Sequence, residues 1–538
     1  MSAGSESLAW RVVFPTADAD EIAPLYFDRS HGTEPSSPTI DARTSLTLAP
    51  DETVSLGSYF NAFPAAFWTR FTDASHARLR ASLAGSGVLR LVRSDGLGRE
   101  RTLEVLVIDG EAAVEASIDL ASFADGGACW IDLEAGERGL TLTDAAWWVD
   151  APTTDEGTAS VGITTFNRAP HALAQLRAIA ETPDLDPLVS RVVLVDQGTD
   201  HVADQPGFAE VAARLGDRLR VVYQPNLGGS GGFSRGMLET LADGTARHHI
   251  VLDDDAISEP EALARAIRFA NATTRPTIVG GGMLHLDDRA RLYTQSEQWD
   301  ERTGWVRLQR QGAYNHDFAV TGFRDASFFH RVEHSDYNGW WMCLIPVSVL
   351  REVGVALPLF LKGDDVEFAL RARAAGVPTV SVPGVAVWHL GWDGKNPTRT
   401  WEAYFLHRNR LITELLHSRQ RRGTGVVVHS LLGDLKVLLS GAPGAVRLRR
   451  LAADDAMVGP DALPAWLGTR APEVRSYATR LGEADAPGLG VRLAIAAGSV
   501  ATAWRLWRRW PRLAAAYRAA APELASVKRW RGILDLPA

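Results

Sequence analysis

The sequence contains few cysteines, no long hydrophobic run and no excess of basic residues. Its two cysteines, Cys129 and Cys343, are too few for a disulfide framework or a thiolate zinc site, so we expect a reducing compartment. The longest apolar stretch, near residues 493–504, is about a dozen residues long, whereas a membrane-spanning helix needs ~20. The first residues lack a basic segment followed by an apolar core, which argues against a signal peptide. We therefore expect a cytoplasmic protein without a membrane span.

The charge and composition exclude two further classes of protein. A formal net charge of −9 argues against a general nucleic-acid-binding protein, which would present a basic face. Hydrophobic residues make up 46% of the chain and charged residues 22%, which is typical of a globular rather than a disordered protein. A chain of 538 residues is expected to form about three domains.

The first 155 residues show short β-type runs separated by glycine and aspartate turns. Runs of this size predict an antiparallel β-sandwich over residues 1–155. The runs that carry this prediction are TSLTLAP, TVSLGSYF, GVLRLVRS, RTLEVLVID, AAVEASIDL, CWIDLEAG and GLTLTDAAWWV. The polar segment 151–160 has no hydrophobic pattern and indicates a linker to the next region.

From residue 156 to about residue 400, strand candidates alternate with helix candidates. The strand candidates are VGITTF, RVVLVDQG, LRVVYQPN, HHIVLDDD and TIVGGGML, and the helix candidates lie near residues 170–181, 205–215, 231–242 and 259–271. This alternation predicts an α/β domain with a parallel sheet and crossover helices. Residues 401–538 are rich in arginine, alanine and leucine, and their pattern predicts a C-terminal helical region.

Several polar side chains directly follow the predicted strands. They are Arg168, Gln197, Asn226 and the triplet Asp253, Asp254 and Asp255. Because ligands of open α/β sheets bind beyond the carboxyl ends of the strands, we expect these side chains to meet at one edge of the sheet.

The triplet lies in HIVLDDDAIS (249–258), where an apolar strand runs into three adjacent carboxylates. A solvated acidic turn is one explanation. Helix capping does not explain the triplet, because Ser258 with Glu261 already forms a capping-box pattern for the following helix. A divalent cation would offset the repulsion, and carboxylate oxygens suit Mg²⁺ or Mn²⁺. An Asp-x-Asp pair after an apolar strand is the arrangement typical of nucleotide-sugar transferases.

Further segments each have a structural and a functional explanation. The glycine-rich segment 226–232 is either a flexible turn or a place where backbone amides approach an anionic ligand. Trp340 and Trp341 form either a core pair or an aromatic platform. The acidic pair at residues 364–365 precedes a predicted helix and has the chemistry of a general base. His389 ends an apolar strand, either as a buried core residue or as a metal ligand.

Taken in order, these segments closely resemble the polymerising galactofuranosyltransferases of actinobacterial cell-wall galactan. The resemblance runs from near residue 10 to about residue 415, and the remaining residues match loosely. The matching segments include RVVFP, YFNAFPAAFW, GITTFNR, DQG, QPNLGGSGGFSR, LDDDAISEP, DYNGWW, PLFLKGDDVEFALRA, GVAVWHLGW and YFLHRNRL.

The resemblance implies an N-terminal β-sandwich, a GT-A transferase domain and a C-terminal helical region, placed here at residues 1–155, 156–400 and 401–538. It also implies metal-dependent, inverting transfer of galactofuranose from UDP-galactofuranose to a lipid-linked galactan acceptor. The implied cofactor is Mn²⁺ or Mg²⁺. By position, the metal ligands are Asp253, Asp255 and His389, the catalytic base is Asp365, and the nucleotide-sugar contacts are Arg168, Gln197, Asn226, Asp253, Asp254 and Asp255. Trp340, Trp341, Glu297 and Asp364 correspond to the acceptor side.

The chain also departs from the family pattern near the acceptor side. Gly363 stands where the family commonly has tryptophan, and Glu367 and Phe368 replace aspartate and tyrosine. The C-terminal region is also shorter. These departures leave the acceptor, the linkage and the product length open.

Two alternatives remain at the level of the sequence. One is an inverting transferase that uses another nucleotide sugar, such as a rhamnosyl donor. The other is a non-catalytic glycan-binding scaffold, against which the retention of Asp253, Asp255, Asp365 and His389 argues. The sequence also leaves a homo-oligomer open.

The C-terminal tail mixes tryptophan and arginine in WRLWRRW (504–510) and VKRWR (527–531). This mixture predicts peripheral attachment to the inner face of the cell membrane. The alternative is a terminal helix whose tryptophans pack on the transferase domain.

Overall fold

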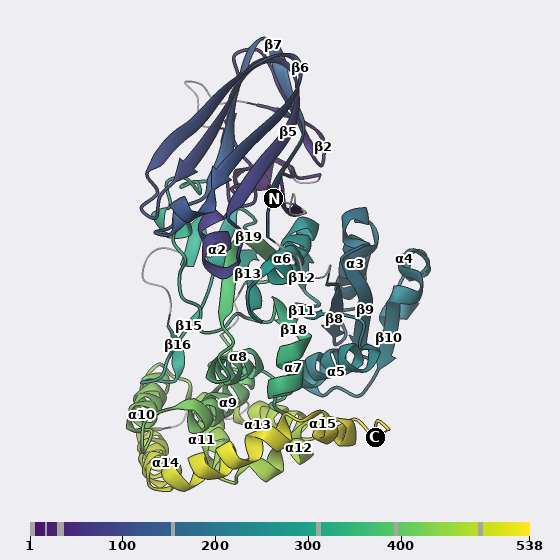
Figure 1. Cartoon of the computed structure of the whole chain (residues 1–538). Helices are drawn as coiled ribbons and strands as arrows, with labels where there is room; N and C mark the ends of the chain where they lie inside the picture. The colour runs from purple at the N-terminus through teal and green to yellow at the C-terminus, as the bar shows by residue number, and fades with distance from the viewer. Residues whose placement is uncertain are drawn as a thin grey trace.

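The computed structural model describes residues 6–16, 19–29, 37–151, 157–307, 314–391, 396–482 and 488–537. A β-rich region, an α/β region and a helical region follow one another along the chain and along the long dimension of the molecule (Figure 1). Among the described residues, no helix is long and apolar enough to cross a membrane.

The N-terminal region is built on one seven-stranded antiparallel sheet in the order β2-β3-β7-β5-β6, with β1 and β4 also paired to β7. The strands are β1 (Ser7–Arg11), β2 (Thr39–Ala42), β3 (Ser45–Leu48), β4 (Thr53–Ser55), β5 (His76–Ser94), β6 (Glu100–Asp119) and β7 (Cys129–Val149), and the helices α1 (Ala19–Ile22) and α2 (Ala65–Phe71) lie between them. The predicted β-rich region is therefore present.

Three of these strands are longer than the sequence pattern predicts. The runs RTLEVLVID and AAVEASIDL are both part of β6, and CWIDLEAG and GLTLTDAAWWV are both part of β7. The glycines that were expected to end strands bend them instead, since Gly85, Gly110 and Gly139 all have positive φ within β5, β6 and β7. Gly85 pairs with Gly110, and a Cβ on Gly85 would lie 2.3 Å from the carbonyl oxygen of Gly139. The bend therefore runs across all three strands at one level.

The central region has the predicted alternation of strands and helices. Its ten-stranded sheet has the order β10-β9-β8-β11-β18-β13-β14-β17, with β12 and β19 paired off this path. The strands are β8 (Ala159–Thr165), β9 (Val189–Asp196), β10 (Leu219–Tyr223), β11 (His248–Asp253), β12 (Ala256–Ser258), β13 (Ile278–His285), β14 (Arg291–Thr294), β17 (Tyr314–Asp317), β18 (Met342–Pro346) and β19 (Thr379–His389). A separate hairpin consists of β15 (Gln298–Asp300) and β16 (Trp305–Arg307).

The strands β10, β9, β8 and β11 are parallel, as expected. The antiparallel strand β18 then enters between β11 and β13, so the sheet is mixed rather than wholly parallel. Its helices are α3 (Ala169–Ala180), α4 (Phe208–Leu215), α5 (Gly228–Asp243), α6 (Pro260–Ala272), α7 (Val347–Val353) and α8 (Asp364–Ala374). The first four match the helix candidates of the sequence.

The cap of α6 differs from the prediction. Ser258 belongs to β12, where its hydroxyl donates to the side chain of Gln175, so it is not available as a cap. Glu259 is the N-cap instead, and its carboxylate accepts from the backbone N–H of Glu261 at 3.0 Å. The same carboxylate contacts Tyr26 and Arg43, which ties the start of α6 to the N-terminal region.

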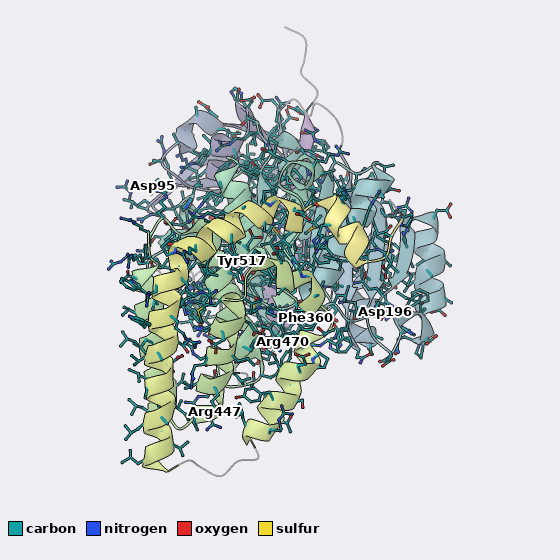
Figure 2. All side chains as sticks on the ribbon, turned by 90° about the horizontal axis from the view of Figure 1, so that it is seen from below. Asp95, Asp196, Phe360, Arg447, Arg470 and Tyr517 are labelled. Atoms are coloured by element: carbon teal, nitrogen blue, oxygen red, sulfur yellow. The ribbon has the colours of Figure 1, made fainter. Side chains whose placement is uncertain are left out.

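The C-terminal region is helical throughout its described part. Its helices are α9 (Glu402–His417), α10 (Thr424–Leu439), α11 (Pro443–Ala456), α12 (Leu463–Trp466), α13 (Arg470–Gly482), α14 (Leu489–Leu524) and α15 (Val527–Ile533). Seen from below, α14 changes direction part-way along its length, close to the labelled Tyr517 (Figure 2). Pro511 lies inside this helix and, because it lacks a backbone N–H, gives a physical reason for a bend.

Most tail tryptophans pack against the protein. Trp510 and Trp530 are fully buried, and the indole N–H of Trp530 donates to the carbonyl of Ala356 at 2.8 Å. Trp507 is half-buried, whereas Trp504 keeps 55% of its surface exposed. For Trp510 and Trp530, packing on the protein is therefore the correct explanation.

Candidate active site

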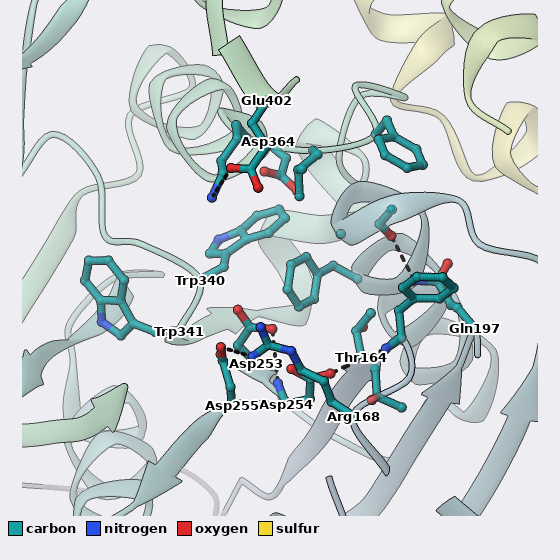
Figure 3. Close-up of a pocket in the computed structure, with 18 of the residues that line it drawn as sticks. Thr164, Arg168, Gln197, Asp253, Asp254, Asp255, Trp340, Trp341, Asp364 and Glu402 are labelled. Atoms are coloured by element: carbon teal, nitrogen blue, oxygen red, sulfur yellow. Dashed lines mark hydrogen bonds and ion pairs between the residues drawn. The ribbon is translucent and has the colours of Figure 1, made fainter. Parts of the chain in front are cut away.

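A cavity of about 400 Å³ opens at the carboxyl ends of the parallel strands (Figure 3). Its walls combine the ends of β8, β11 and β19, the loops after β9 and β10, the segment before β18, and the starts of α8 and α9. The sequence-predicted residues that line it are Arg168, Gln197, Asn226, Asp253, Asp254, Asp255, Trp340, Trp341, Asp364, Asp365 and His389. The prediction that Arg168, Gln197, Asn226 and the aspartate triplet meet at one edge of the sheet is therefore confirmed for their positions, while their roles stay predictions.

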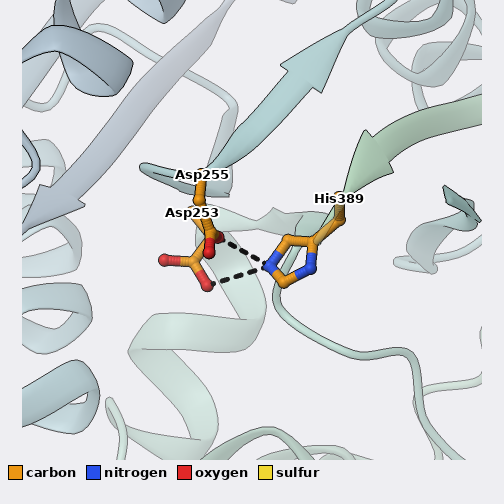
Figure 4. Close-up of side chains that lie close together, drawn as sticks. All are labelled: Asp253, Asp255 and His389. Atoms are coloured by element: carbon orange, nitrogen blue, oxygen red, sulfur yellow. Dashed lines mark hydrogen bonds and ion pairs between the residues drawn. The ribbon is translucent and has the colours of Figure 1, made fainter. Parts of the chain in front are cut away.

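Asp253, Asp255 and His389 form a compact cluster at one end of this cavity (Figure 4). One ligand atom from each residue lies within 4.8 Å of the others. The Nε2 atom of His389 is 2.8 Å from an oxygen of Asp255 and 3.5 Å from an oxygen of Asp253. Strand β19 places His389 beside the two aspartates because it pairs with β12, which directly follows them in the sequence. Two strands far apart in the sequence thus place two carboxylates and one imidazole together.

The other ring nitrogen of His389 fixes the orientation of the imidazole. Its Nδ1–H donates to the carbonyl oxygen of Leu390 at 2.9 Å, so Nε2 points toward the carboxylates. Burial alone would lower the pKa of His389, but the hydrogen bonds and charges of Asp253 and Asp255 outweigh it and raise this pKa to about 10. The cluster therefore attracts positive charge strongly.

Arg168 adds a second cation to this end of the cavity. Its guanidinium forms an ion pair with Asp255 and is half-buried at the start of α3. Burial would raise the pKa of Asp255, but His389 and Arg168 together hold it well below the ordinary carboxyl range. Asp254 differs, because burial and the two neighbouring carboxylates raise its pKa. The three adjacent carboxyl groups are therefore not equivalent.

Gln197 and Asn226 shape the glycine-rich loop. The side-chain oxygen of Gln197 accepts from the backbone N–H of Leu227, and its amide nitrogen donates to the carbonyl of Gly228. The Asn226 side chain accepts from the N–H of Gly228 at 2.9 Å. A Cβ on Gly232 would lie 2.0 Å from the Thr164 side chain, so a glycine there lets α5 pack closely on β8. The glycine at residue 232 therefore serves close packing, and the N–H groups of Leu227 and Gly228 are bonded within the protein.

The second acidic pair lies across the cavity at the start of α8. Asp364 is buried and Asp365 is half-buried. Burial raises the pKa of both carboxyl groups, and the charge of Asp365 raises that of Asp364 further. Lys362 opposes the shift of Asp365 by its positive charge. A carboxyl with a raised pKa is better matched to accepting a proton near neutral pH.

The loop before this acidic pair has an unusual backbone. Phe360 and Lys362 have positive φ values of 70° and 69°, which is uncommon for residues other than glycine, and Gly363 follows with a φ of 82°. The backbone of Phe360 is bonded to Ser230 in both directions, since its N–H donates to the serine hydroxyl at 2.8 Å and its carbonyl accepts from the serine N–H at 3.3 Å. This loop is thereby fixed to α5.

A side chain from the C-terminal region also holds the loop. The amide nitrogen of Asn409, on α9, lies 3.1, 2.8 and 2.8 Å from the carbonyl oxygens of Leu359, Leu361 and Lys362. Arg408 donates to the Leu359 carbonyl as well, at 2.7 Å. Both side chains are buried. The sequence reasoning quoted HRNR only as part of the resemblance and gave these residues no role. Two consecutive polar residues on the buried face of an apolar helix were the signal that could have found them.

The remaining residues predicted for the acceptor side differ in their burial and in whether they line the cavity. Trp340 is buried, with its ring edge-to-face against Phe233 and Phe368 at 5.3 and 5.6 Å, and it still lines the cavity. Trp341 is half-buried and donates from its indole to the carbonyl of Gly281. Glu297 is buried behind this region and does not line the described cavity. Burial, with a smaller contribution from the Asp365 charge, raises its pKa to about 7.

Sequence comparisons agree with this geometry. The glycosyltransferase like family 2 matches residues 157–413, and the galactofuranosyltransferase 2 N-terminal family matches residues 9–150. Galactofuranosyltransferase GlfT2 of Mycolicibacterium smegmatis is 37% identical over 490 residues, which cover 89% of this chain and 75% of the relative. GlfT2 of Mycobacterium tuberculosis is 35% identical over 487 residues, 88% of this chain and 76% of the relative.

The chain belongs to the galactofuranosyltransferase family. A weaker match, at 26% identity over 268 residues, is to GlfT1 of Mycobacterium tuberculosis and covers 45% of this chain and 78% of that relative. Within the family, the chain therefore resembles GlfT2 more than GlfT1. The predictions of a glycosyltransferase, and of a GT-A transferase domain between an N-terminal β-sheet region and a C-terminal helical region, are confirmed.

Proposed function

We propose that this galactofuranosyltransferase transfers galactofuranose, with inversion and with the help of Mn²⁺ or Mg²⁺, from UDP-galactofuranose to a lipid-linked galactan acceptor. The observation that carries the proposal is the presence of two separate acidic groups on one cavity. Asp253 and Asp255 lie with His389 on one side, and Asp365 lies on the other. An inverting transfer needs charge stabilisation for a leaving diphosphate and one base for the acceptor, which these two groups can supply separately.

The residues present fit a divalent cation. Two carboxylate oxygens and one imidazole nitrogen are a donor set that suits Mn²⁺ or Mg²⁺, and the Leu390 carbonyl already orients His389 with Nε2 inward. When bound, such an ion would neutralise charge on the diphosphate as a Lewis acid. Arg168 pairs with Asp255 and would add a fixed positive charge beside the same diphosphate.

The remaining donor contacts come from the loops after β9 and β10. Gln197 and Asn226 hold the first residues of α5 in place by hydrogen bonds to Leu227 and Gly228, and Gly228 and Gly229 line the cavity. We assign the uridine nucleotide to this side, because Gln197 and Asn226 line the cavity here and occupy the nucleotide-binding positions that the family resemblance implies. Asp254 lines the cavity between the nucleotide side and the metal ligands.

The acceptor side is assigned to Asp365 and its neighbours. Asp365 accepts the proton of the attacking hydroxyl, a role typically worth ~10²–10⁴-fold in rate. Trp340 and Trp341 form apolar wall on this side, with Asp364 beside them. Glu297 is buried outside the cavity lining, and the charge of Asp365 contributes to raising its pKa, which places it near the acceptor side. Trp401, Glu402 and Arg475 add walls from the C-terminal helical region, which lies outside the predicted transferase domain 156–400.

We also propose peripheral attachment to the inner face of the cell membrane, but through exposed side chains and not through the buried tryptophans of the tail. Trp510 and Trp530 are buried and cannot insert into lipid. Exposed apolar side chains instead lie on α10 and on the N-terminal half of α14, where Leu439 and Leu489 expose 85% and 74% of their surfaces. The Arg508 guanidinium lies 4.6 Å from the ring of Trp504 on the same helix. Apolar and cationic groups together suit a headgroup interface.

Incubation with nucleotide sugars tests the proposed reaction. The protein, Mn²⁺ and a short galactofuranosyl acceptor are mixed with UDP-galactofuranose or with a rhamnosyl nucleotide, and the products are analysed by mass and linkage. We expect extension by hexose units from UDP-galactofuranose alone. Transfer from the rhamnosyl donor instead would show that the donor assignment is wrong.

A further inference from the structure

A second cleft lies at the amino-terminal ends of the parallel strands, on the opposite side of the central sheet from the candidate active site. It has a volume of about 740 Å³ and is formed where β8 and β11 begin and where α6 and β18 end. Arg247 and His248 line it at the start of β11, whereas Asp253 ends the same strand. At ~3.3 Å per residue, the length of β11 separates the two sites by roughly 17 Å. The cleft is therefore distinct from the catalytic cavity.

Three arginines from three separate segments meet at this cleft. Arg247, Arg275 and Arg351 all line it and are exposed. Within the described part of the chain, none of the three side chains has an ion pair or a hydrogen bond, and no aspartate or glutamate lines the cleft. Other arginines of the same region are paired, as shown by Arg191 with Asp243 and Arg268 with Glu261. In a chain with a net charge of −9, three uncompensated cations around one hollow favour an anionic ligand.

The other lining residues indicate which anion fits. The hydroxyl groups of Thr158 and Ser348 add hydrogen-bond donors, as phosphate oxygens require, whereas the Thr245 hydroxyl already donates to Asp243. Among the described residues, no phenylalanine, tyrosine or tryptophan lines the cleft, which gives a nucleobase no large ring to stack on. His248 is buried in the wall and bonds to Asn271 through Nε2, while its Nδ1 has no hydrogen-bond partner in the described structure. Because Nε2 donates to the Asn271 oxygen and Nδ1 is enclosed, His248 does not contribute a donor to the cleft.

We infer that this cleft binds the phosphate groups of a non-aromatic anion such as pyrophosphate or a phosphorylated headgroup. Arg247, Arg275 and Arg351 provide the charge, and the hydroxyls of Thr158 and Ser348 provide the orienting donors. Binding here requires no residue of the catalytic cavity. The inference therefore does not depend on the proposed reaction.

Calorimetric titration with inorganic pyrophosphate in metal-free buffer tests the inference. Arg168→Ala serves as the background, because it removes the cation of the catalytic cavity that pairs with Asp255 and lowers binding of an anion there. In that background we expect Arg247→Glu/Arg351→Glu to weaken binding at least tenfold, and the milder Arg247→Gln/Arg351→Gln to weaken it less. The matched control is Arg302→Glu/Arg419→Glu, which changes the net charge equally at two other exposed arginines and should bind as the background does. Equal affinity in the cleft and control variants, or no binding at all, would overturn the inference.

A vesicle experiment separates the two sources of phosphate. The full chain is sedimented with vesicles of phosphatidylcholine alone or mixed with phosphatidylglycerol, with and without pyrophosphate. Cosedimentation that needs the anionic lipid, is lost in the cleft variant and is displaced by pyrophosphate would identify a headgroup as the ligand. Pyrophosphate binding without cleft-dependent sedimentation would identify a free anion. Transfer activity should be unchanged when Arg247→Glu/Arg351→Glu is introduced into the chain that retains Arg168, which separates this result from the proposed function.

Discussion

Replacing Asn409 with leucine should slow transfer without weakening donor binding. Leucine has nearly the same size as asparagine but cannot donate hydrogen bonds. The Leu359 carbonyl keeps Arg408 as a donor, whereas the carbonyls of Leu361 and Lys362 each lose the Asn409 amide. An orphaned buried acceptor costs ~1–3 kcal/mol. Because Leu361 and Lys362 are half-buried, ~2–6 kcal/mol is the upper range for the two carbonyls together. This loss acts on the strained loop directly before Asp365.

We expect about half of this cost to appear as misplacement of the base. Half of this cost is ~1–3 kcal/mol, and 1.36 kcal/mol corresponds to a factor of ten in rate. The kcat should therefore fall by ~5-fold to ~10²-fold, with the KM for the donor changed less than about twofold. Thr413→Val is the matched control, because Thr413 is buried one turn further along α9 and its hydroxyl has no partner in the described structure. Steady-state kinetics and thermal unfolding are measured on both variants. A lowered melting temperature with an unchanged kcat would refute the positioning role and leave Asn409 a purely structural residue.

Three other perturbations test separate parts of the site. Chelation with EDTA should abolish transfer and added Mn²⁺ or Mg²⁺ should restore it; full activity in chelator would contradict the metal assignment. Asp365 must be deprotonated to act as the base, and burial raises its pKa. The value of kcat/KM should therefore decrease as pH falls through this pKa, and this acid limb of the profile should lie above the ordinary carboxyl range. Lys362→Met removes a charge that lowers this pKa and should move the limb to higher pH, whereas an unmoved limb would mean that another group titrates. Trp504→Ser should reduce cosedimentation with anionic vesicles while thermal stability is kept, and equal sedimentation would remove this tryptophan from any membrane role.

The sequence predicts the central α/β region well because its hydrophobic runs are short, buried and regularly spaced. The helix candidates near residues 170–181 and 259–271 correspond to α3 and α6 within one or two residues. The antiparallel strand β18 was missed, because MCLIP (342–346) is apolar and short and carries no mark of its direction. Strand direction is decided by tertiary pairing with β11 and β13.

The N-terminal strands show a different limit. A glycine between two β-type runs is equally compatible with a turn and with a bend inside one strand, and Gly110 is the latter. The predicted cap at Ser258 failed for a related reason, since pairing of β12 with β19 placed this serine in a strand. In both cases, pairing with a strand distant in the sequence determined which local backbone conformation formed.

For the site, the sequence identified residues at strand ends and missed those that act from the C-terminal helices. Asp253 and His389 could be named because they end apolar strands that lead to one edge of the sheet. Asn409 and Arg475 reach the site only through the packing of α9 and α13, which has no local sequence signature. The membrane test uses a point variant at Trp504 and not a truncation, because α14 also carries the fully buried Trp510.

The central claim is that two acidic groups divide the work, with donor binding at Asp253 and Asp255 and proton acceptance at Asp365. Asp365→Asn tests it most directly, because asparagine keeps the shape of the side chain but cannot act as the base. Transfer from UDP-galactofuranose and the Kd for UDP with Mn²⁺ are measured on the same protein. The account predicts a loss of transfer of at least ~10²-fold with a nearly unchanged Kd. A parallel loss of UDP affinity, or transfer at the unmodified rate, would contradict it.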